Sequence, residues 1–490
     1  MLLSLAAPVA ILVLSGLVLG PKLTFTALVA NSGLICTFLL LIHLWCTQKL
    51  PHKQKGAFGF FHPFANGGGG GERVLWCAVA AVQAVAPEAQ VIIFSGDGLS
   101  AQQLLESAAS NFNITVTDRF QVVQLHNRHL LLPERYPRFT LLGQALGSFR
   151  LGHEALKNAV PEIFVDTTGW AFTYPLARLA GCKVVAYTHY PMVSANMLQR
   201  VMLRTFTYNN QLAVAKSGIR SLIKVVYYYV VAAIYGAAGG FANVSIVNST
   251  WTADHIRQLW WKWKAPTVVF PPCNTLTLQQ LPLDRKLKRL YLVSVAQFRP
   301  EKNHRLQLEA FARVRQAALQ DQDSAESAVL AAQLKLVGSC RGPDDKSRLT
   351  QLQSYSQALG LHNCVEFCIN VPFDELTSLL AGAVGGLHTM LDEHFGISIV
   401  EYMAAGVVPI VHDSGGPRAD IVKPERMRHG WQTTGYLCTT EEQYANAITE
   451  VLCMDQQDRL KIAAAARQRA AKFSDQQFEQ DFVKAIQPLL

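Results

Sequence analysis

The sequence has few charged side chains. Asp, Glu, Lys and Arg together make up 16% of its 490 residues, whereas half of the residues are hydrophobic. So low a charged fraction is lean for a soluble protein, and it indicates that part of the apolar surface faces lipid rather than a core. The composition therefore favours a protein in contact with a membrane.

The ten cysteines lack the spacing of a metal site and of a disulfide framework. Cys364 and Cys368 are the nearest pair to test as a ligand set, but no second pair and no histidines stand at metal-ligand spacing from them. A structural metal is therefore not expected. Unpaired, irregularly spaced cysteines are typical of a reducing compartment, which favours a cytosolic location for most of the chain.

An RNA-reading motif, an internal repeat and a long disordered tail are also missing. The formal net charge of +9 suits anionic partners, namely membrane surfaces, phosphates or nucleic acid. Without an RNA-reading motif, the first two are favoured and nucleic acid is not an expected partner. The chain is too long for one hydrophobic core, so two domains of ordinary size are predicted.

Two long apolar runs occupy the first 50 residues. Residues 2–19 and 23–46 carry no charged side chain, and each run is long enough to reach across the hydrocarbon layer of a bilayer. No basic segment precedes the first run, which argues against a cleaved signal peptide. We predict a hydrophobic membrane anchor at residues 1–50, followed by lysines that stay in the cytosol. Whether both runs cross the membrane or one lies shallowly in it is left open.

After the anchor, short β-branched runs alternate with stretches long enough for a helix. This alternation predicts an α/β fold with parallel sheets, and the strands suffice for two of them. Prolines and charges interrupt the pattern at residues 270–290, where we place the domain boundary. The predicted domains are residues 55–272 and 285–472, followed by a C-terminal helix at residues 473–490 that can cross back to the N-terminal domain.

Residues 197–240 differ from the rest of the first predicted domain. Basic side chains recur there at multiples of four, so within each helical piece they share one face beside Leu, Val and Tyr. Such a helix is typical of the headgroup layer of a membrane, with its cations towards phosphates. A solvated basic face on a core helix is the alternative. The basic residues predicted to contact membrane lipid or a lipid acceptor are Arg200, Arg204, Lys216, Arg220 and Lys224.

The most specific pattern runs from Leu391 to Gly416. A strand is predicted to end before Glu393, and a helix that opens at Gly396 runs through Glu401, so the N–H groups at the helix start suit an anion. Carboxylates would repel a phosphate. The two glutamates are therefore predicted to accept hydrogen bonds from hydroxyl groups, one from those of a sugar and the other from those of a ribose. Two surface glutamates on an ordinary helix are the alternative that the spacing alone allows.

This segment resembles the E-x7-E signature of the retaining nucleotide-sugar glycosyltransferases of family four. The matching parts, in family order, include the glycine-rich loop, His189 after a strand, FPP, RPEKN, KLVGS, EHFGISIVE and the Gly415-Gly416 pair. The resemblance covers nearly the whole chain after about residue 57. It implies the GT-B architecture, in which two Rossmann-like domains face each other across a cleft.

The resemblance also implies roles for single residues. Glu393 corresponds to the glutamate that contacts the donor sugar, Glu401 to the one that binds the ribose, and His189 to a histidine near the donor sugar and the acceptor hydroxyl. The implied catalytic residues are His189, Glu393, Lys302 and Arg299. The implied donor-binding residues are Gly69, Gly70, Gly71, Arg299, Lys302, Glu393, Phe395, Gly396, Ile397 and Glu401.

The diphosphate side departs from the family at one position. The family arginine five residues before the lysine is Gln297 here, whereas Lys302 matches, so Arg299 is taken as the substitute for the arginine. The cations, the glycine amides and a helix N-terminus can together do the work of a divalent cation. No Asp-x-Asp pair follows a strand, so neither a metal nor another cofactor is expected. The family also implies a front-face reaction in which the leaving phosphate takes the acceptor proton.

Within family four, the apolar N-terminus and the stretches FHPFANGGGGGERVLW, YTHYPMVS and AQFRPEKNH resemble the dolichol-pathway α-1,2-mannosyltransferases. This resemblance implies transfer of the fourth and fifth mannoses from GDP-mannose to Man3GlcNAc2-PP-dolichol at the endoplasmic reticulum membrane, with cytosolic catalytic domains. Other mannosyltransferases of the pathway are the further partners that it suggests. Two alternatives remain: a family-four transferase that uses UDP-glucose or a different acceptor, and a membrane scaffold without activity.

Overall fold

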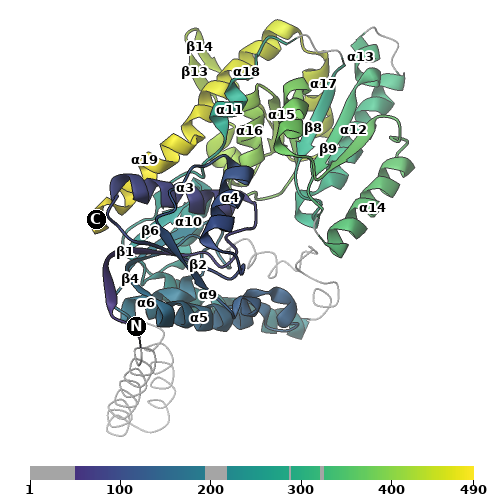
Figure 1. The fold of residues 1–490 in the computed structure, drawn as a ribbon. Coiled ribbons are helices and arrows are strands. Elements are labelled where there is room, and N and C mark those ends of the chain that lie inside the picture. The colour runs from purple at the N-terminus through teal and green to yellow at the C-terminus, as the bar shows by residue number, and fades with distance from the viewer. Residues whose placement is uncertain (1–49, 194–217, 286–288, 321–324, 341) are drawn as a thin grey trace. The chain divides into compact units, whose positions relative to one another are not determined.

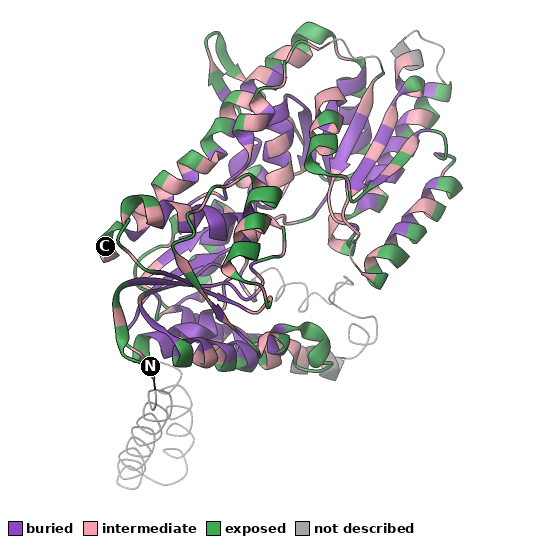
Figure 2. Cartoon of the chain, viewed as in Figure 1, coloured by how far each residue is buried: buried purple, intermediate pink, exposed green. Residues whose placement is uncertain are grey.

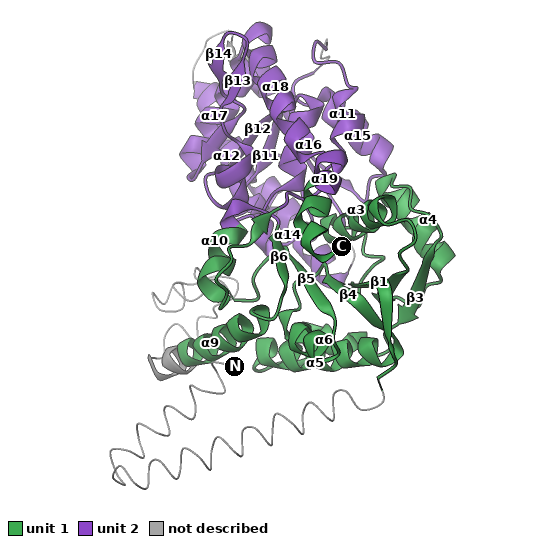
Figure 3. Ribbon diagram, turned by 90° about the vertical axis from the view of Figure 1, so that its left-hand side faces the viewer, with its two compact units in different colours: residues 1–247, 252–268, 481–490 green, residues 248–251, 269–480 purple. Residues whose placement is uncertain are grey.

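The structure (Figure 1) is a computed structural model that describes residues 50–193, 218–285, 289–320, 325–340 and 342–490. Residues 1–49 of the predicted anchor and the predicted lipid-contacting residues Arg200, Arg204 and Lys216 lie outside this part. Within these ranges, no helix is both long and apolar enough to cross a membrane. The chain forms two compact units (Figure 3): unit 1 is residues 1–247, 252–268 and 481–490, and unit 2 is residues 248–251 and 269–480.

Unit 1 is built on a parallel seven-stranded sheet with the order β3-β2-β1-β4-β5-β6-β7. Valine, isoleucine and phenylalanine fill the strands, because β-branched and aromatic residues suit a pleated, buried surface. The ring of Phe164 lies 5.6 Å from that of Phe61 on the adjacent strand and 6.2 Å from that of Phe94 on the strand beyond it. The strands are β1 (Lys53–Phe61), β2 (Val91–Ser95), β3 (Phe120–Gln124), β4 (Val160–Asp166), β5 (Lys183–Thr188), β6 (Val244–Val247) and β7 (Thr267–Val268).

Helices cover both faces of this sheet. α5, α6 and α9 lie on one face, whereas α3 and α4 lie on the other (Figure 1). α4 begins where the Ser100 hydroxyl accepts a hydrogen bond from the N–H of Gln103, which is ordinary N-capping. The helices are α3 (Gly70–Val85), α4 (Ala101–Phe112), α5 (Thr140–Asn158), α6 (Tyr174–Leu179), α9 (Gly218–Gly239) and α10 (Thr250–Leu259), the last of which belongs to unit 1 from Thr252 onward.

Unit 2 contains a second parallel sheet, of six strands in the order β10-β9-β8-β11-β12-β15. These strands are β8 (Tyr291–Val295), β9 (Gln333–Gly338), β10 (Val365–Ile369), β11 (Gly385–His388), β12 (Val408–His412) and β15 (Tyr436–Cys438). A separate antiparallel ribbon pairs β13 (Glu425–Met427) with β14 (Gly430–Gln432). Figure 2 shows that the strands of this sheet are mostly buried, whereas the helices outside it are exposed on their outer sides.

Two groups of helices pack on the unit 2 sheet and form two apolar cores. One core is formed with α12 (His304–Gln320), α13 (Ala325–Ala331), α14 (Pro343–Ala358) and α17 (Glu441–Cys453). The other is formed with α11 (Thr275–Gln279), α15 (Phe373–Gly382), α16 (Ile397–Ala405) and α18 (Gln456–Ala470). The last helix, α19 (Asp475–Ile486), begins in unit 2 and belongs to unit 1 from Asp481 onward. Within unit 1, Lys183 donates a hydrogen bond to the carbonyl of Leu489.

The two parallel sheets confirm the predicted α/β class. β1 lacks the β-branched pattern that predicts the other strands, because glycine inside a strand weakens the β signal. Gly59 in β1 has a packing reason: a Cβ there would lie 2.6 Å from Pro161 and 2.7 Å from Phe94. Since all strands of each sheet are parallel, their carboxyl ends share one edge, and residues that follow different strands meet there.

Candidate active site

Lys302 and Glu393 come together at the carboxyl edge of the unit 2 sheet. Lys302 ends a short 3₁₀ turn, Pro300–Lys302, after β8, and Glu393 lies in the turn after β11. β8 and β11 are adjacent strands, so both turns leave the sheet at the same place. The Thr389 hydroxyl connects them, because it donates a hydrogen bond to the carbonyl of Lys302 at 2.9 Å.

The carboxylate of Glu393 is held on both of its oxygens. Nζ of Lys302 lies 2.5 Å from Oε2 of Glu393. Nε2 of His388, the last residue of β11, lies 3.1 Å from the same oxygen. The N–H of His394 donates to Oε1 at 3.2 Å. These three contacts therefore hold the carboxylate in one orientation.

The environment keeps Glu393 ionised. Burial raises the pKa of Glu393, but the charge of Lys302 and the hydrogen bond from His388 outweigh burial and hold this pKa well below 4.5. Burial also lowers the pKa of His388, whose side chain is only 3% exposed. At neutral pH the Lys302–Glu393 pair is thus ionic, and His388 is a neutral donor.

The Gly415-Gly416 pair supports the turn that carries Glu393. A Cβ on Gly415, which has a φ of +58°, would lie 2.2 Å from the carbonyl oxygen of Glu393. A Cβ on Gly416 would lie 2.6 Å from the carbonyl oxygen of His394. The N–H of Gly416 donates to the carbonyl of Glu393 at 2.8 Å. Only glycine fits at these two positions, because the two backbone segments are in direct contact.

The other predicted donor-binding residues of this segment lie around the start of α16. Gly396 has a φ of +112° and directly precedes the helix, which begins at Ile397 and includes Glu401 in its second turn. The ring of Phe395 is buried, 5.8 Å from that of Phe270 and 5.4 Å from that of Phe473. Phe395 can therefore meet a ligand only through its backbone, whereas its side chain anchors the turn in the core.

The structure does not bring Arg299 to Glu393. Its side chain is exposed, and no ion pair or side-chain hydrogen bond of Arg299 occurs among the described residues. Its carbonyl accepts a hydrogen bond from the N–H of Lys302 at 3.2 Å, so the two residues belong to the same turn. The role of Arg299 at a diphosphate therefore stays a prediction.

Unit 1 has its own cluster at the carboxyl edge of its sheet. His62, Thr167 and His189 each follow directly after a strand, β1, β4 and β5 respectively, and these strands are adjacent. Nδ1 of His62 lies 2.7 Å from the Thr167 hydroxyl, and Nε2 of His189 lies 3.0 Å from the Thr167 carbonyl oxygen. Thr167 thus links the two histidines.

Glu72 fixes the glycine-rich loop of unit 1. Its Oε2 accepts a hydrogen bond from the N–H of Gly69 at 2.7 Å, and its Oε1 lies 3.7 Å from Nε2 of His62. Burial raises the pKa of Glu72, but the hydrogen bond to His62 and those to backbone N–H groups outweigh burial and lower it below 4.5. A Cβ on Gly67 would lie 2.4 Å from Oε1 of Glu72. The loop therefore wraps closely around this carboxylate.

Gly70 and Gly71 are the first two residues of α3. Their N–H groups have no partner within the helix, as at any helix N-terminus, and such groups suit an anion. A Cβ on Gly71 would lie 3.7 Å from Nε2 of His189. The start of α3 and His189 are therefore neighbours, as a shared ligand would require.

A buried carboxylate lies beneath this cluster. Asp166, the last residue of β4, is fully buried and accepts hydrogen bonds from the Tyr174 hydroxyl at 2.7 Å and from the N–H of Thr168 at 2.9 Å. Burial raises the pKa of Asp166. Asp166 stabilises the backbone on either side of Thr167, and so it supports the cluster without facing a ligand.

Sequence reasoning did not single out His62, Glu72, Thr167 or His388. Each of these residues except Glu72 ends or directly follows a strand of a parallel sheet. That position was the available signal, because ligands of α/β folds bind outside the carboxyl ends of strands. It is a weak signal without knowledge of which strands are adjacent.

Residues 197–217 of the predicted lipid-contacting segment lie outside the described residues. Arg220 falls within α9 at a position where the structure describes no side chain. Nζ of Lys224 lies 5.8 Å from the centre of the Tyr228 ring, which indicates a cation–π contact. Burial lowers the pKa of Lys224. Its contact with lipid stays a prediction.

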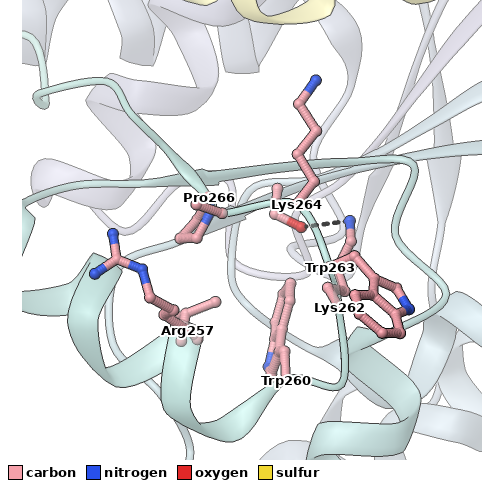
Figure 4. Close-up of a pocket in the computed structure, with 9 residues that line it drawn as sticks. Arg257, Trp260, Lys262, Trp263, Lys264 and Pro266 are labelled. Atoms are coloured by element: carbon pink, nitrogen blue, oxygen red, sulfur yellow. Dashed lines mark hydrogen bonds between the residues drawn. The ribbon is translucent and has the colours of Figure 1, made fainter.

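Unit 1 also contains a hollow of about 90 Å³, and Figure 4 shows the side chains that line it. It is lined by cations and tryptophans before β7, and Nζ of Lys262 donates to the Ser245 hydroxyl at 2.9 Å. Burial lowers the pKa of Lys262 to about 8. The loop from Lys262 to Pro266 leads into β7 and so lies at the amino end of that strand, whereas the histidine cluster lies at carboxyl ends. This hollow is therefore not part of the candidate active site.

Among the described residues, no group of three or more His, Cys, Asp and Glu side chains is arranged to hold a metal ion. The chemistry available at the two clusters is hydrogen bonding, charge stabilisation and anion binding by helix N-termini.

The fold is similar to that of solved sugar-nucleotide enzymes. A crystal structure of Anabaena HepE in complex with UDP and glucose matches 88% of this chain and 99% of its own, with a TM-score of 0.57 and 18% identity. The sucrose-phosphate synthase from Thermosynechococcus elongatus matches 88% of this chain and 98% of its own, with a TM-score of 0.59 and 18% identity. At such low identity these likenesses define the fold alone, a GT-B-like fold with two parallel sheets.

Family models and curated relatives define the class and then the family. Residues 280–469 match the model "Glycosyl transferases group 1", so the chain is a glycosyltransferase. Residues 55–260 match the model "ALG11 mannosyltransferase N-terminus". The Homo sapiens and Mus musculus proteins named GDP-Man:Man(3)GlcNAc(2)-PP-Dol alpha-1,2-mannosyltransferase are 42% and 44% identical to it, and the alignments cover 93% and 94% of this chain and 94% of each relative. The chain belongs to this mannosyltransferase family, which confirms the resemblance drawn from its sequence.

Proposed function

We propose that this protein transfers mannose from GDP-mannose to Man3GlcNAc2-PP-dolichol and forms an α-1,2 linkage with retention at the sugar. The observation that carries the proposal is the near full-length identity to relatives named for this reaction. The candidate active site supports it, because Lys302 and Glu393 lie together where the family places a diphosphate and a sugar. Addition of both the fourth and the fifth mannose is part of the proposal.

The proposed reaction moves negative charge onto a leaving diphosphate. A cation near that diphosphate stabilises the transition state more than the ground state, because the charge develops as the bond breaks. A pair of unit charges about 4 Å apart at an effective dielectric near 20 is worth roughly 4 kcal/mol. At about 1.4 kcal/mol per factor of ten, Lys302 contributes up to about a thousandfold.

Each cluster also has hydrogen-bonding groups that can bind the sugar, the ribose or the acceptor. Glu393 accepts hydrogen bonds from the sugar hydroxyls, and Glu401 accepts hydrogen bonds from the ribose hydroxyls. In unit 1, His189 binds a hydroxyl group, and the N–H groups of Gly70 and Gly71 bind negative charge. The acceptor hydroxyl oxygen bonds to the anomeric carbon on the face from which the diphosphate leaves, as the bond between sugar and diphosphate breaks. The leaving phosphate takes the proton of that hydroxyl, so that neither a protein nucleophile nor a protein base is required.

A lipid acceptor requires contact with a membrane, and unit 1 offers a surface for it. Tyr227 of α9 connects this helix to α5, because its ring lies 5.3 Å from that of Phe139 and its hydroxyl accepts a hydrogen bond from the N–H of Leu142. Exposed apolar side chains then continue along both helices, which suits the headgroup layer of a bilayer. This α5–α9 face consists of Phe139, Leu142, Leu146, Val226, Tyr229 and Val230.

The proposal includes the location of the protein. The anchor predicted at residues 1–50 holds it in the endoplasmic reticulum membrane with both units in the cytosol, near the other mannosyltransferases of the pathway. Asn113-Ile-Thr115 is a glycan acceptor sequence, and Asn113 is exposed after α4. In cells Asn113 should stay unmodified. A mass shift at this residue after glycosidase treatment would show that unit 1 is on the lumenal side.

A transfer assay tests the reaction itself. The full chain is incubated with radiolabelled GDP-mannose or UDP-glucose and a short-chain lipid-pyrophosphate Man3GlcNAc2 acceptor. We expect label in the lipid fraction from GDP-mannose alone, in one and then two α-1,2-linked residues. Label from UDP-glucose would indicate a different family-four transferase, and label from neither donor would indicate a scaffold without activity.

A further inference from the structure

The two charged side chains of the unit 2 site are paired with each other. Nζ of Lys302 contacts Oε2 of Glu393, although the proposed reaction needs Lys302 at the diphosphate and Glu393 at the sugar. A lysine that contacts a diphosphate gives up at least part of its contact with the carboxylate. Binding of a nucleoside diphosphate sugar therefore requires an exchange of partners.

His388 is the side chain positioned to hold Glu393 through this exchange. Its Nε2 lies 3.1 Å from Oε2 of Glu393, the same oxygen that Lys302 contacts. His388 is fixed as the end of β11, and its carbonyl accepts a hydrogen bond from the Tyr444 hydroxyl at 3.0 Å. Unlike the flexible lysine, the imidazole cannot turn away towards a ligand, because it is buried.

The hydrogen-bond partners of His388 also define its protonation. A carboxylate only accepts, so Nε2 of His388 carries the proton. Nδ1 of His388 is buried and has no hydrogen-bond partner among the described residues, so a second proton there would lack an acceptor. Burial lowers the pKa of His388, in agreement with a neutral ring. The imidazole thus donates to Glu393 without competing for the diphosphate as a cation.

We propose that His388 is a positioning residue that holds Glu393 for the sugar when Lys302 turns to the diphosphate. The inference rests on the proposed function and assigns a specific task to a residue of the same site. It follows that loss of the His388 hydrogen bond weakens binding of the sugar but leaves binding of the nucleotide diphosphate intact. A histidine that only fills the core would affect both.

The test compares two substitutions at the same position. His388→Leu keeps an apolar side chain of similar bulk and removes the donor. His388→Gln keeps a donor, because the amide nitrogen of glutamine reaches about as far as Nε2. For each full-length variant we would measure the KM for GDP-mannose and kcat with the lipid-linked acceptor, the inhibition constant of GDP, and the thermal unfolding midpoint.

We expect His388→Leu to lower kcat/KM for GDP-mannose by about tenfold or more, the loss that follows from removing a hydrogen bond to a charged group. The GDP inhibition constant should change by less than about twofold, because GDP has no sugar for Glu393 to bind. His388→Gln should recover most of the lost kcat/KM. Equal weakening of GDP and GDP-mannose, or a glutamine variant no better than leucine, would overturn the proposal.

His304→Leu is the matched control. His304 is also a buried histidine of this unit, but neither of its ring nitrogens has a hydrogen-bond partner among the described residues. This variant should keep the wild-type preference for GDP-mannose over GDP. A loss of preference equal to that of His388→Leu would also contradict the inference.

Two further measurements keep the proposal testable. If His388→Leu does not fold, His388→Asn replaces it, because the shorter amide reaches only the position of Nδ1. If the wild-type protein forms no mannosylated product, the proposed function fails. The role of His388 is then tested by calorimetry, which compares the binding of GDP-mannose with that of GDP. Loss of sugar-dependent binding in the asparagine variant but not in the glutamine variant supports the inference, and identical binding in both contradicts it.

Discussion

The two clusters at the carboxyl edges of the sheets use different chemistry. In unit 1, Thr167 is hydrogen-bonded to His62 through its hydroxyl and to His189 through its carbonyl. The glycine-rich loop there is held to Glu72 by the N–H of Gly69. In unit 2, the central contact is the ion pair of Lys302 and Glu393. The first arrangement can stay in place when a ligand arrives, whereas the second has to exchange partners. Substitutions in unit 2 should therefore have the larger effects on catalysis.

The largest effect is expected for Lys302→Ala. The change removes the cation for the leaving diphosphate and leaves Glu393 without its ionic partner, so we expect kcat/KM to fall by up to about a thousandfold. Steady-state mannose transfer measures it. Arg299→Ala is the matched comparison, because Arg299 lies in the same turn but is exposed. If the two variants lose activity equally, the diphosphate is bound by the turn as a whole, and the exchange of partners by the Lys302–Glu393 ion pair does not distinguish the two clusters.

A smaller effect is expected for His189→Ala in unit 1. The change removes a hydrogen-bonding group beside the start of α3 and should lower kcat by about a hundredfold, the usual range for one positioned catalytic side chain. GDP affinity should stay close to that of the wild type, because His189 is assigned to the donor sugar and the acceptor hydroxyl, which GDP lacks. Measurement of kcat and of the GDP inhibition constant separates the two effects, and an equal loss of both would reject the assignment of His189.

Glu72→Gln should have a milder effect. The amide oxygen can still accept the hydrogen bond from Gly69, but the negative charge next to His62 is lost, so we expect kcat/KM to fall by about threefold to tenfold. Glu88→Gln is a suitable control, because Glu88 is exposed in the turn that follows α3. A loss of more than about a hundredfold would mean that the charge of Glu72 acts on the ligand directly.

The smallest expected effect concerns stability rather than catalysis. Burial lowers the pKa of His304 from 6.5 to about 3. Below pH 6.5, His304 binds a proton in the unfolded chain but not in the folded one. The contribution of His304 to the free energy of unfolding is therefore fully present above pH 6.5 and is lost as the pH falls towards the pKa of the folded state. At pH 5 the loss should be on the order of 2 kcal/mol.

His304→Phe should remove this contribution. Thermal unfolding at pH 7.5 and pH 5.0 checks it, because the variant should lose less stability between these values than the wild type. An equal loss in both proteins would mean that other groups, such as the carboxylates, determine the acid sensitivity.

Much of the fold could be predicted from local sequence. The sequence stretches "KVVAYTHY" and "GGLHTM" are short β-branched or apolar runs between helical stretches, as the predicted alternation requires, and they contain β5 and β11. β1 was missed because Gly56 and Gly59 interrupt its apolar pattern. The requirement for Gly59 comes from Pro161 and Phe94, which are distant in sequence and press on it only in the folded sheet.

The site was predictable to a more limited extent. Lys302 and Glu393 were each predicted from the family motifs, and the structure adds that they form an ion pair. The Gly415-Gly416 pair was recognised as part of the signature, but its reason, the direct contact with the backbone of the Glu393 turn, depends on tertiary packing. His388 gave no signal, because a histidine at the end of a buried strand looks like a core residue until the neighbouring turn is placed.

The sequence by itself determined the alternation of strands and helices, the parallel sheets and the family, because these depend on local hydrophobic pattern and on motifs of contiguous residues. The tertiary structure decided which of these residues touch. Lys302 and Glu393 are 91 positions apart, and His62 and Thr167 are 105 apart. They meet only because adjacent parallel strands end at one edge, and the order of strands in a sheet is set by packing of the whole unit rather than by any local stretch of chain.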